Sequence, residues 1–200
     1  MARNINPENP TERGQGPGER KGLGRADLGT DNTNYNKKYR PRLQVPYTAN
    51  HIFLEVLSFA TLAVLIGVFI FVMVKAPNLV PVHYGADGQV DLWGPKSNLW
   101  GPFIVGFIIY SALYVISRFP HALNYFVGIT RENALKQYSL MRTFLTIIRG
   151  IAALLFAYIL YSAYLVSINQ TPARDLNIMS LIGVMVVTIF TYLLIAARNR

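Results

Sequence analysis

The 200 residues contain no cysteine, and charged residues are scarce. Without cysteine the chain can form no disulfide, no thiolate metal site and no cysteine nucleophile. Charged residues make up 14% of the chain, whereas soluble domains average about 25%. Residues 1–51 hold 9 of the 19 basic and 5 of the 10 acidic residues. The other 149 positions, 52–200, carry too few charges to form a solvated surface, which argues against a soluble globular protein.

Enzyme signatures are also missing. The sequence has no HExxH, no GxSxG, no phosphate-binding loop and no pair of acidic residues within its apolar segments. Its histidines, His51, His83 and His121, are expected at the edge of one apolar segment and in two separate loops. We therefore expect no catalytic activity, no cofactor and no metal site.

Four long apolar segments dominate the rest of the chain. A bilayer core is crossed by about 20 helical residues, and the segments have about that length. They cover residues 52–74, 99–117, 144–168 and 178–197. The sequence thus predicts an all-α integral membrane protein with four transmembrane helices. Each helix holds a glycine near its middle or cytoplasmic end that we expect to allow close helix packing. These glycines are Gly67, Gly106, Gly150 and Gly183.

Residues 1–46 precede the membrane domain, which we place at residues 47–200. They are rich in glycine and proline and hold only isolated apolar residues, so we predict a disordered basic arm. Basic residues are concentrated in this arm, between the second and third spans, and at the C-terminus. The positive-inside rule then predicts that both termini are cytoplasmic and that residues 75–98 and 169–177 are exported.

Two charged side chains lie inside predicted spans. Glu55 is one turn into the first span, and Arg149 is about two turns into the third. Both lie near the cytoplasmic side, at similar depths and close to the interface. Two interpretations of these charges therefore stay open. The pair can form an ion pair that joins the two helices, or each side chain can extend separately to the interface.

The exported segment 75–98 is the most distinctive local sequence. Asp87-Gly88 suits a tight turn between two short β-prone runs, which predicts a hairpin over the end of the bundle. The candidate recognition residues in it are Pro81, His83, Tyr84, Asp87, Gly88, Asp91, Trp93 and Lys96. The glycines and prolines exclude the helix that would align His83, Asp87 and Asp91, so we predict no metal site there. We expect His83 and Asp91 to hydrogen-bond within the loop.

The segment after the second span predicts a further helix. Thr130 can cap a helix that starts at Arg131, and Glu132 would lie near its positive end. Basic and apolar residues then alternate as far as Arg142. This pattern favours a helix that lies along the cytoplasmic interface, binds anionic lipid and then turns into the third span. Docking of a soluble partner is the alternative.

A basic run lies just before the first span. It consists of Lys37, Lys38, Arg40 and Arg42. Such a run attracts anionic lipid headgroups, but basic and tyrosine residues can also bind single-stranded nucleic acid. A third interpretation is an arm that folds against a neighbouring subunit. Because the run adjoins a span, we expect lipid binding and no nucleic acid.

Two stretches carry a family resemblance. The first reads Val80-Pro81-Val82-His83-Tyr84, followed by Gly88, Asp91 and Gly94-Pro95-Lys96. The second contains Asn124, Tyr125, Thr130, Glu132, Asn133, Gln137 and Tyr138, with Phe126 where proline is common. Over about residues 50–145 the chain resembles a bacterial membrane domain of unknown function, family 1648, which also forms the N-terminal part of SdpI-type toxin-immunity proteins. The resemblance implies immunity to a secreted toxin and signalling that holds a repressor at the membrane.

The sequence therefore predicts a non-enzymatic binding or regulatory membrane protein whose exported loop recognises an exported partner. The alternative is an accessory structural subunit of a larger membrane protein complex, held by its arm and its span surfaces. Transport of a small solute is disfavoured, because the spans hold few polar residues near their middles.

Overall fold

The computed structural model describes residues 40–85, 89–168 and 178–199. Within these ranges the chain forms four long helices and one two-stranded sheet. The helices are α2 (Ala49–Lys75), α3 (Trp100–Ser117), α4 (Ala134–Ser167) and α5 (Ile178–Arg198); the strands are β1 (Leu79–Tyr84) and β2 (Val90–Pro95); two short 3-10 helices are η1 (Lys96–Leu99) and η2 (Pro120–Ala122). All four long helices are long and apolar enough to cross a membrane. The predicted fold class is therefore confirmed, and the chain is a multi-pass membrane protein that requires a lipid bilayer.

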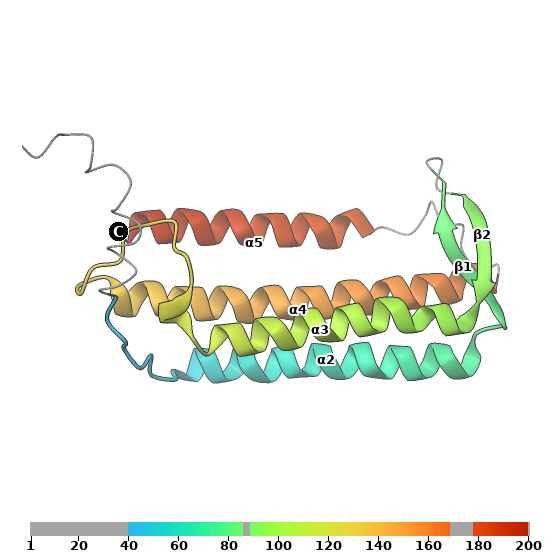
Figure 1. Ribbon diagram of the computed structural model, residues 1–200, viewed down its shortest axis with the longest axis horizontal. Helices are drawn as coiled ribbons and strands as arrows, with labels where there is room; N and C mark the ends of the chain where they lie inside the picture. Colours follow the sequence, from blue (N-terminus) through green and yellow to red (C-terminus); the bar gives the residue numbers. More distant parts are fainter. Residues whose placement is uncertain (1–39, 86–88, 169–177, 200) are drawn as a thin grey trace, which may run out of the picture.

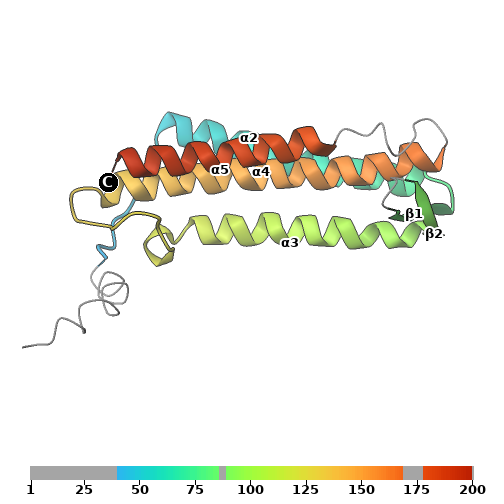
Figure 2. The ribbon, with the colours of Figure 1, turned by 90° about the horizontal axis from the view of Figure 1, so that it is seen from above.

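Helix α4 is the centre of an elongated bundle, and the other three helices pack against it. The views in Figure 1 and Figure 2 show the four helices running along one axis. The β1–β2 hairpin lies at one end of this bundle, while residues 40–48 and the C-terminal end of α5 lie at the other. We call these the hairpin end and the terminal end.

A capping box at the start of helix α2 and a proline after its end explain the bounds of this helix. The Thr48 hydroxyl accepts the His51 backbone N–H, and the His51 ring accepts the Thr48 backbone N–H, which forms a capping box. An uninterrupted apolar run then carries the helix to Lys75. Pro77 follows, and a residue before proline disfavours helical geometry.

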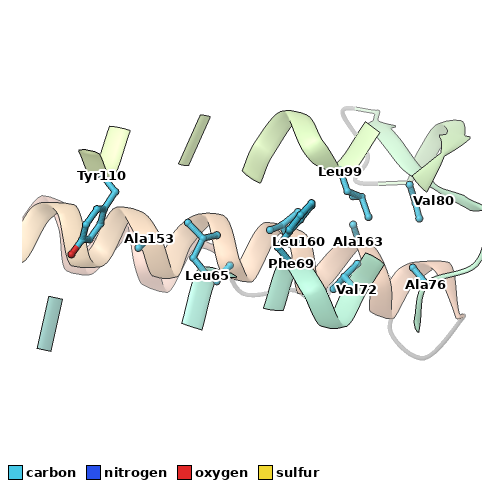
Figure 3. Packing of buried hydrophobic residues seen from close by; sticks show 11 residues of the cluster. Leu65, Phe69, Val72, Ala76, Val80, Leu99, Tyr110, Ala153, Leu160 and Ala163 are labelled. Atoms are coloured by element: carbon cyan, nitrogen blue, oxygen red, sulfur yellow. The ribbon is translucent and has the colours of Figure 1, made fainter. Parts of the chain in front are cut away.

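The core lies between α2 and the small residues of α4. Leu65 and Val72 of α2 are fully buried, and they share one cluster with Ala153 and Leu160 of α4. Figure 3 shows this cluster continuing along the helices to Val80 of strand β1. Alanines on α4 let the helix backbones approach closely, which is how helices associate in lipid.

The four glycines do not all serve helix packing. A Cβ on Gly106 would lie 2.7 Å from Phe156 of α4, so α3 can approach α4 only with glycine at this position. Gly150 faces the Thr61 hydroxyl at 3.5 Å from the added Cβ, an ordinary contact. A Cβ added to Gly67 or Gly183 would have no described atom of another element within 4 Å. The packing role that we expected for these two glycines is therefore wrong.

No separate interfacial helix precedes the third span within the described residues. Helix α4 runs from Ala134 to Ser167 without interruption, so the expected turn between the two is wrong. Its 34 residues extend over about 51 Å at 1.5 Å per residue, longer than a hydrocarbon core of about 30 Å. The first turns are helical because Tyr138 and Met141 are buried against other parts of the chain rather than laid on a membrane surface.

The predicted arm does not extend to residue 46 as an independent segment. Residues 1–39 lie outside the described part of the chain, whereas residues 40–48 lie against the terminal end of the bundle. Val45 is buried in a cluster with Ile129, Ala134 and Tyr138. This apolar contact with α4 holds the described residues 40–48 against the bundle.

Candidate functional site

Glu55 and Arg149 meet inside the bundle. Nη2 of Arg149 donates a hydrogen bond to Oε2 of Glu55, and the two form an ion pair. The Arg149 side chain is 0% exposed and that of Glu55 is 13% exposed. Arg149 Nε also donates to Ser58 Oγ at 2.8 Å, and the Thr146 hydroxyl donates to Glu55 Oε1 at 3.3 Å. A fully buried guanidinium does not extend to the interface, so this geometry fits the paired interpretation.

Three aromatic rings surround the same guanidinium. Its Cζ lies 5.8 Å from the ring centre of Phe59, 5.4 Å from that of Tyr110 and 4.9 Å from that of Tyr114. Ring faces attract a desolvated cation. Through Tyr110 and Tyr114, α3 therefore helps to stabilise the buried charge of Arg149 on α4. The sequence indicates the two charges but not these aromatic partners. Helical spacing places Phe59 one turn beyond Glu55, but no local signal indicates that Tyr110 and Tyr114 face the same point.

The β1–β2 hairpin has one anchored side. Its antiparallel register runs from Leu79 opposite Pro95 to Tyr84 opposite Val90. Val80, Pro81 and Gly94 are buried, and a Cβ on Gly94 would lie 2.6 Å from Asn98 Nδ2 and 2.7 Å from Val82 Cγ2. Lys96 Nζ donates to the Met73 carbonyl at 3.2 Å, which ties the hairpin to α2. Among the predicted recognition residues, Pro81 and Lys96 therefore hold the hairpin in place.

The outer side of the hairpin combines one polar pair with apolar side chains. His83 Nδ1 lies 2.7 Å from Asp91 Oδ1, with the side chains 67% and 52% exposed. This is the contact within the loop that we expected. The same hairpin also exposes the large apolar side chains of Leu79, Val82, Leu92 and Trp93. Tyr84 is also on the hairpin, and burial raises the pKa of its hydroxyl. Asp87 and Gly88 lie outside the described residues, and the described residues contain no cluster of three possible metal ligands.

The predicted cytoplasmic motif joins separate parts of the terminal end. Thr130 N–H donates to Asn133 Oδ1 at 2.9 Å, and Asn133 N–H donates to Thr130 Oγ1 at 3.3 Å. This reciprocal pair forms one turn before α4 begins at Ala134, three residues later than predicted. The Thr130 hydroxyl also bonds the exposed Glu132 carboxylate and is the main cause of its lowered pKa.

The remaining motif residues connect the helices with the loops. Gln137 Nε2 donates to the carbonyls of Ala196 and Asn199, both at 3.0 Å, and so holds the last turn of α5. Tyr138 donates to the Pro41 carbonyl at 3.1 Å, and Tyr125 donates to the carbonyl of Pro120 at 2.8 Å. Burial raises the pKa of Tyr125. Asn124 is exposed. Most of this motif therefore makes internal contacts that assemble the terminal end.

The basic run predicted to bind lipid divides into three parts. Lys37 and Lys38 lie outside the described residues. Arg40 is half-buried, donates through Nη1 to the Leu123 carbonyl, and has its Cζ 5.5 Å from the centre of the Tyr125 ring. Because these contacts direct the Arg40 guanidinium into the protein, it is not the free lipid ligand that we expected. Arg42 is exposed.

One part of the chain is similar to a known family. Residues 60–109 match the family model described as Domain of unknown function (DUF1648). The matched stretch covers the second half of α2, the hairpin and most of α3, so the resemblance is confirmed for the region that contains the hairpin motif. No curated protein and no solved structure matches the chain.

Proposed function

We propose that this chain is a non-enzymatic binding or regulatory protein of a bacterial inner membrane, with both termini cytoplasmic, and that the outer side of its hairpin binds an exported partner. The observation that carries this proposal is that the hairpin exposes two large apolar side chains, Leu92 and Trp93, as well as the His83–Asp91 pair. Aromatic and aliphatic side chains around a few polar groups are typical of the centre of a binding surface.

The anchoring of the hairpin supports the same role. Gly94 fits closely against Val82 and Asn98, and Lys96 bonds the end of α2. A surface that is held in place before binding loses less conformational entropy when it binds. We further propose that the partner belongs to the secreted or membrane-active class that the SdpI-associated resemblance implies.

Photo-crosslinking in intact cells tests the proposed binding surface. A photoreactive side chain replaces Leu92 in one variant and Phe126 in the control variant. Phe126 is 71% exposed but lies in the loop at the terminal end, away from the hairpin. We expect a discrete crosslinked product of defined mass from position 92 that position 126 does not give, and we expect Asp91→Asn to weaken it. Equal products from both positions, or none from position 92, would contradict a role for the hairpin.

An accessory subunit of a larger membrane complex is the second candidate. It is favoured by the broad apolar surface of α5, where Phe190 and Leu194 are 62% and 71% exposed and can face either lipid or another protein. Purification in mild detergent followed by native mass measurement separates the two functions. A fixed stoichiometric set of partners would favour the subunit, whereas a monomer or homodimer would favour the binding protein.

A further inference from the structure

Three arginines line one pocket at the terminal end of the bundle. The pocket has a volume of about 730 Å³ and is bordered by the segment before α2, the end of α3 and the first turns of α4. Arg42, Arg118 and Arg142 line it together with Tyr47 and His121. No carboxylate lines this pocket among the residues that the structure describes.

The partners of these arginines leave the positive charge uncompensated. Arg118 Nη1 donates to the Tyr47 hydroxyl at 2.5 Å, and its Nη2 donates to the Tyr114 hydroxyl. Arg142 Nη1 donates to the Val45 carbonyl at 2.9 Å. All three acceptors are neutral, so they satisfy hydrogen bonds but do not neutralise the guanidinium groups.

Arg142 gives a second, independent indication of an anion-binding site. Arg142 is only 8% exposed, and its Nε is buried with no hydrogen-bond partner among the described residues. Arg142 and Arg118 both lie close to the Tyr47 ring, whose centre is 4.6 Å from Arg142 Cζ and 5.8 Å from Arg118 Cζ. Buried charges are normally paired, and guanidinium groups match the geometry of phosphate oxygens.

The position of the pocket indicates the source of the phosphate. Arg118 is the C-cap residue of α3, and Tyr47 directly precedes Thr48, the N-cap of α2. Both residues therefore lie where two membrane-spanning helices end, which is the level of the lipid headgroups. Basic pockets between transmembrane helices at this level bind anionic lipid headgroups.

We propose that this pocket binds the phosphodiester of an anionic phospholipid, with Arg42 and Arg118 as its accessible ligands and Arg142 as the buried charge beneath them. The site differs from the basic run that the sequence indicated. It uses Arg42 from that run, adds arginines of α3 and α4, and leaves out Arg40, which bonds the Leu123 carbonyl. Bound lipid would join the segment before α2 to both helices.

Native mass spectrometry of the full chain in a neutral detergent tests this site, with phosphatidylglycerol and phosphatidylcholine as the probes. We expect one retained phosphatidylglycerol per chain and a clear preference over phosphatidylcholine. Arg42→Gln alone should weaken phosphatidylglycerol binding about fivefold, and Arg42→Gln with Arg118→Gln about thirtyfold, at about 1 kcal/mol per arginine. Arg42 and Arg118 are both exposed, and unchanged circular dichroism would show that the variants fold.

Arg131→Gln is the matched control, because Arg131 is an exposed arginine at the same end but outside the pocket. It should leave phosphatidylglycerol binding unchanged. An equal loss in this control, or equal affinity for the two lipids, would overturn the site. A third arm adds inorganic phosphate at the concentration of the lipid. Continued retention of phosphatidylglycerol supports a lipid ligand, whereas its displacement would assign the pocket to a soluble phosphate and overturn the proposal.

Discussion

Neutralising one member of the Glu55–Arg149 pair should be among the most damaging single changes in the bundle. Glu55→Gln removes the carboxylate but keeps the size of the side chain, and it leaves the Arg149 guanidinium 0% exposed with no anion beside it. Breaking a buried ion pair in this way costs about 3–5 kcal/mol of folding free energy. Arg149→Gln should cost a similar amount, because it also removes the bond to Ser58 and the contacts with three aromatic rings.

The double variant distinguishes a pair from two independent charges. With Gln at both positions, no buried charge is left without a partner and the two amides can hydrogen-bond to each other. We therefore expect the double variant to lose less stability than the sum of the single variants, by about 2 kcal/mol or more, within the range for residues in direct contact.

Unfolding in mixed micelles with increasing sodium dodecyl sulfate gives these free energies. The fluorescence of Trp93 and Trp100, the two tryptophans of the chain, reports the transition. Glu132→Gln serves as the control, because Glu132 is an exposed carboxylate outside the bundle core, and it should leave the midpoint unchanged. Additive losses in the double variant would refute the coupling, as would a Glu55→Gln midpoint equal to that of the control.

Three further predictions follow from other contacts. Gly106→Ala should destabilise the bundle by about 1–3 kcal/mol through overpacking, because the new Cβ would lie 2.7 Å from Phe156. Gly67→Ala should not destabilise it, because no described atom of another element lies within 4 Å of the new Cβ. The same unfolding assay measures both variants. Gln137→Leu should remove the two hydrogen bonds that the Gln137 amide donates to carbonyls at the end of α5. The free energy of local opening there should fall by about 1–3 kcal/mol, so hydrogen exchange should become faster, and an unchanged exchange rate would contradict this role. The Thr130 hydroxyl lowers the pKa of Glu132. The stabilising contribution of this hydrogen bond is therefore present above the unfolded-state pKa of Glu132 and is lost as the pH falls through the folded-state pKa. An NMR titration should show a lowered Glu132 pKa that returns toward its ordinary value in Thr130→Val, and an unchanged pKa in this variant would exclude the bond.

The helices could be predicted from the sequence because the bilayer fixes their length. Each span needs about 20 apolar residues, and composition alone reveals such runs. Glu55 and Arg149 could be singled out for the same reason, since charges are rare inside a membrane and are usually paired or functional. The hairpin was predictable from the turn residues and β-prone runs around it.

The terminal end could not be predicted in the same way, because its contacts join distant residues. Alternating basic and apolar residues before the third span indicated a helix on the membrane surface, yet Tyr138 contacts Pro41 and Gln137 contacts Ala196. A continuous stripe from Ala134 through Tyr138 to Met141 and Leu145, all buried, was the signal of one unbroken helix. Nothing in the sequence indicates that Arg118 and Arg142 share a site, and only the fold brings them to the pocket that Arg42 also lines.

The orientation of the helix bundle in the membrane is tested most directly by labelling single cysteines. The natural sequence has none, so each variant carries one reactive thiol. Ser97 is exposed near the hairpin, and Asn124 is exposed in the loop at the terminal end. We predict that a membrane-impermeant maleimide labels Ser97→Cys in intact cells and labels Asn124→Cys only after the cells are permeabilised. Labelling of Asn124→Cys in intact cells, or recovery of the protein from the aqueous fraction without detergent, would contradict the account.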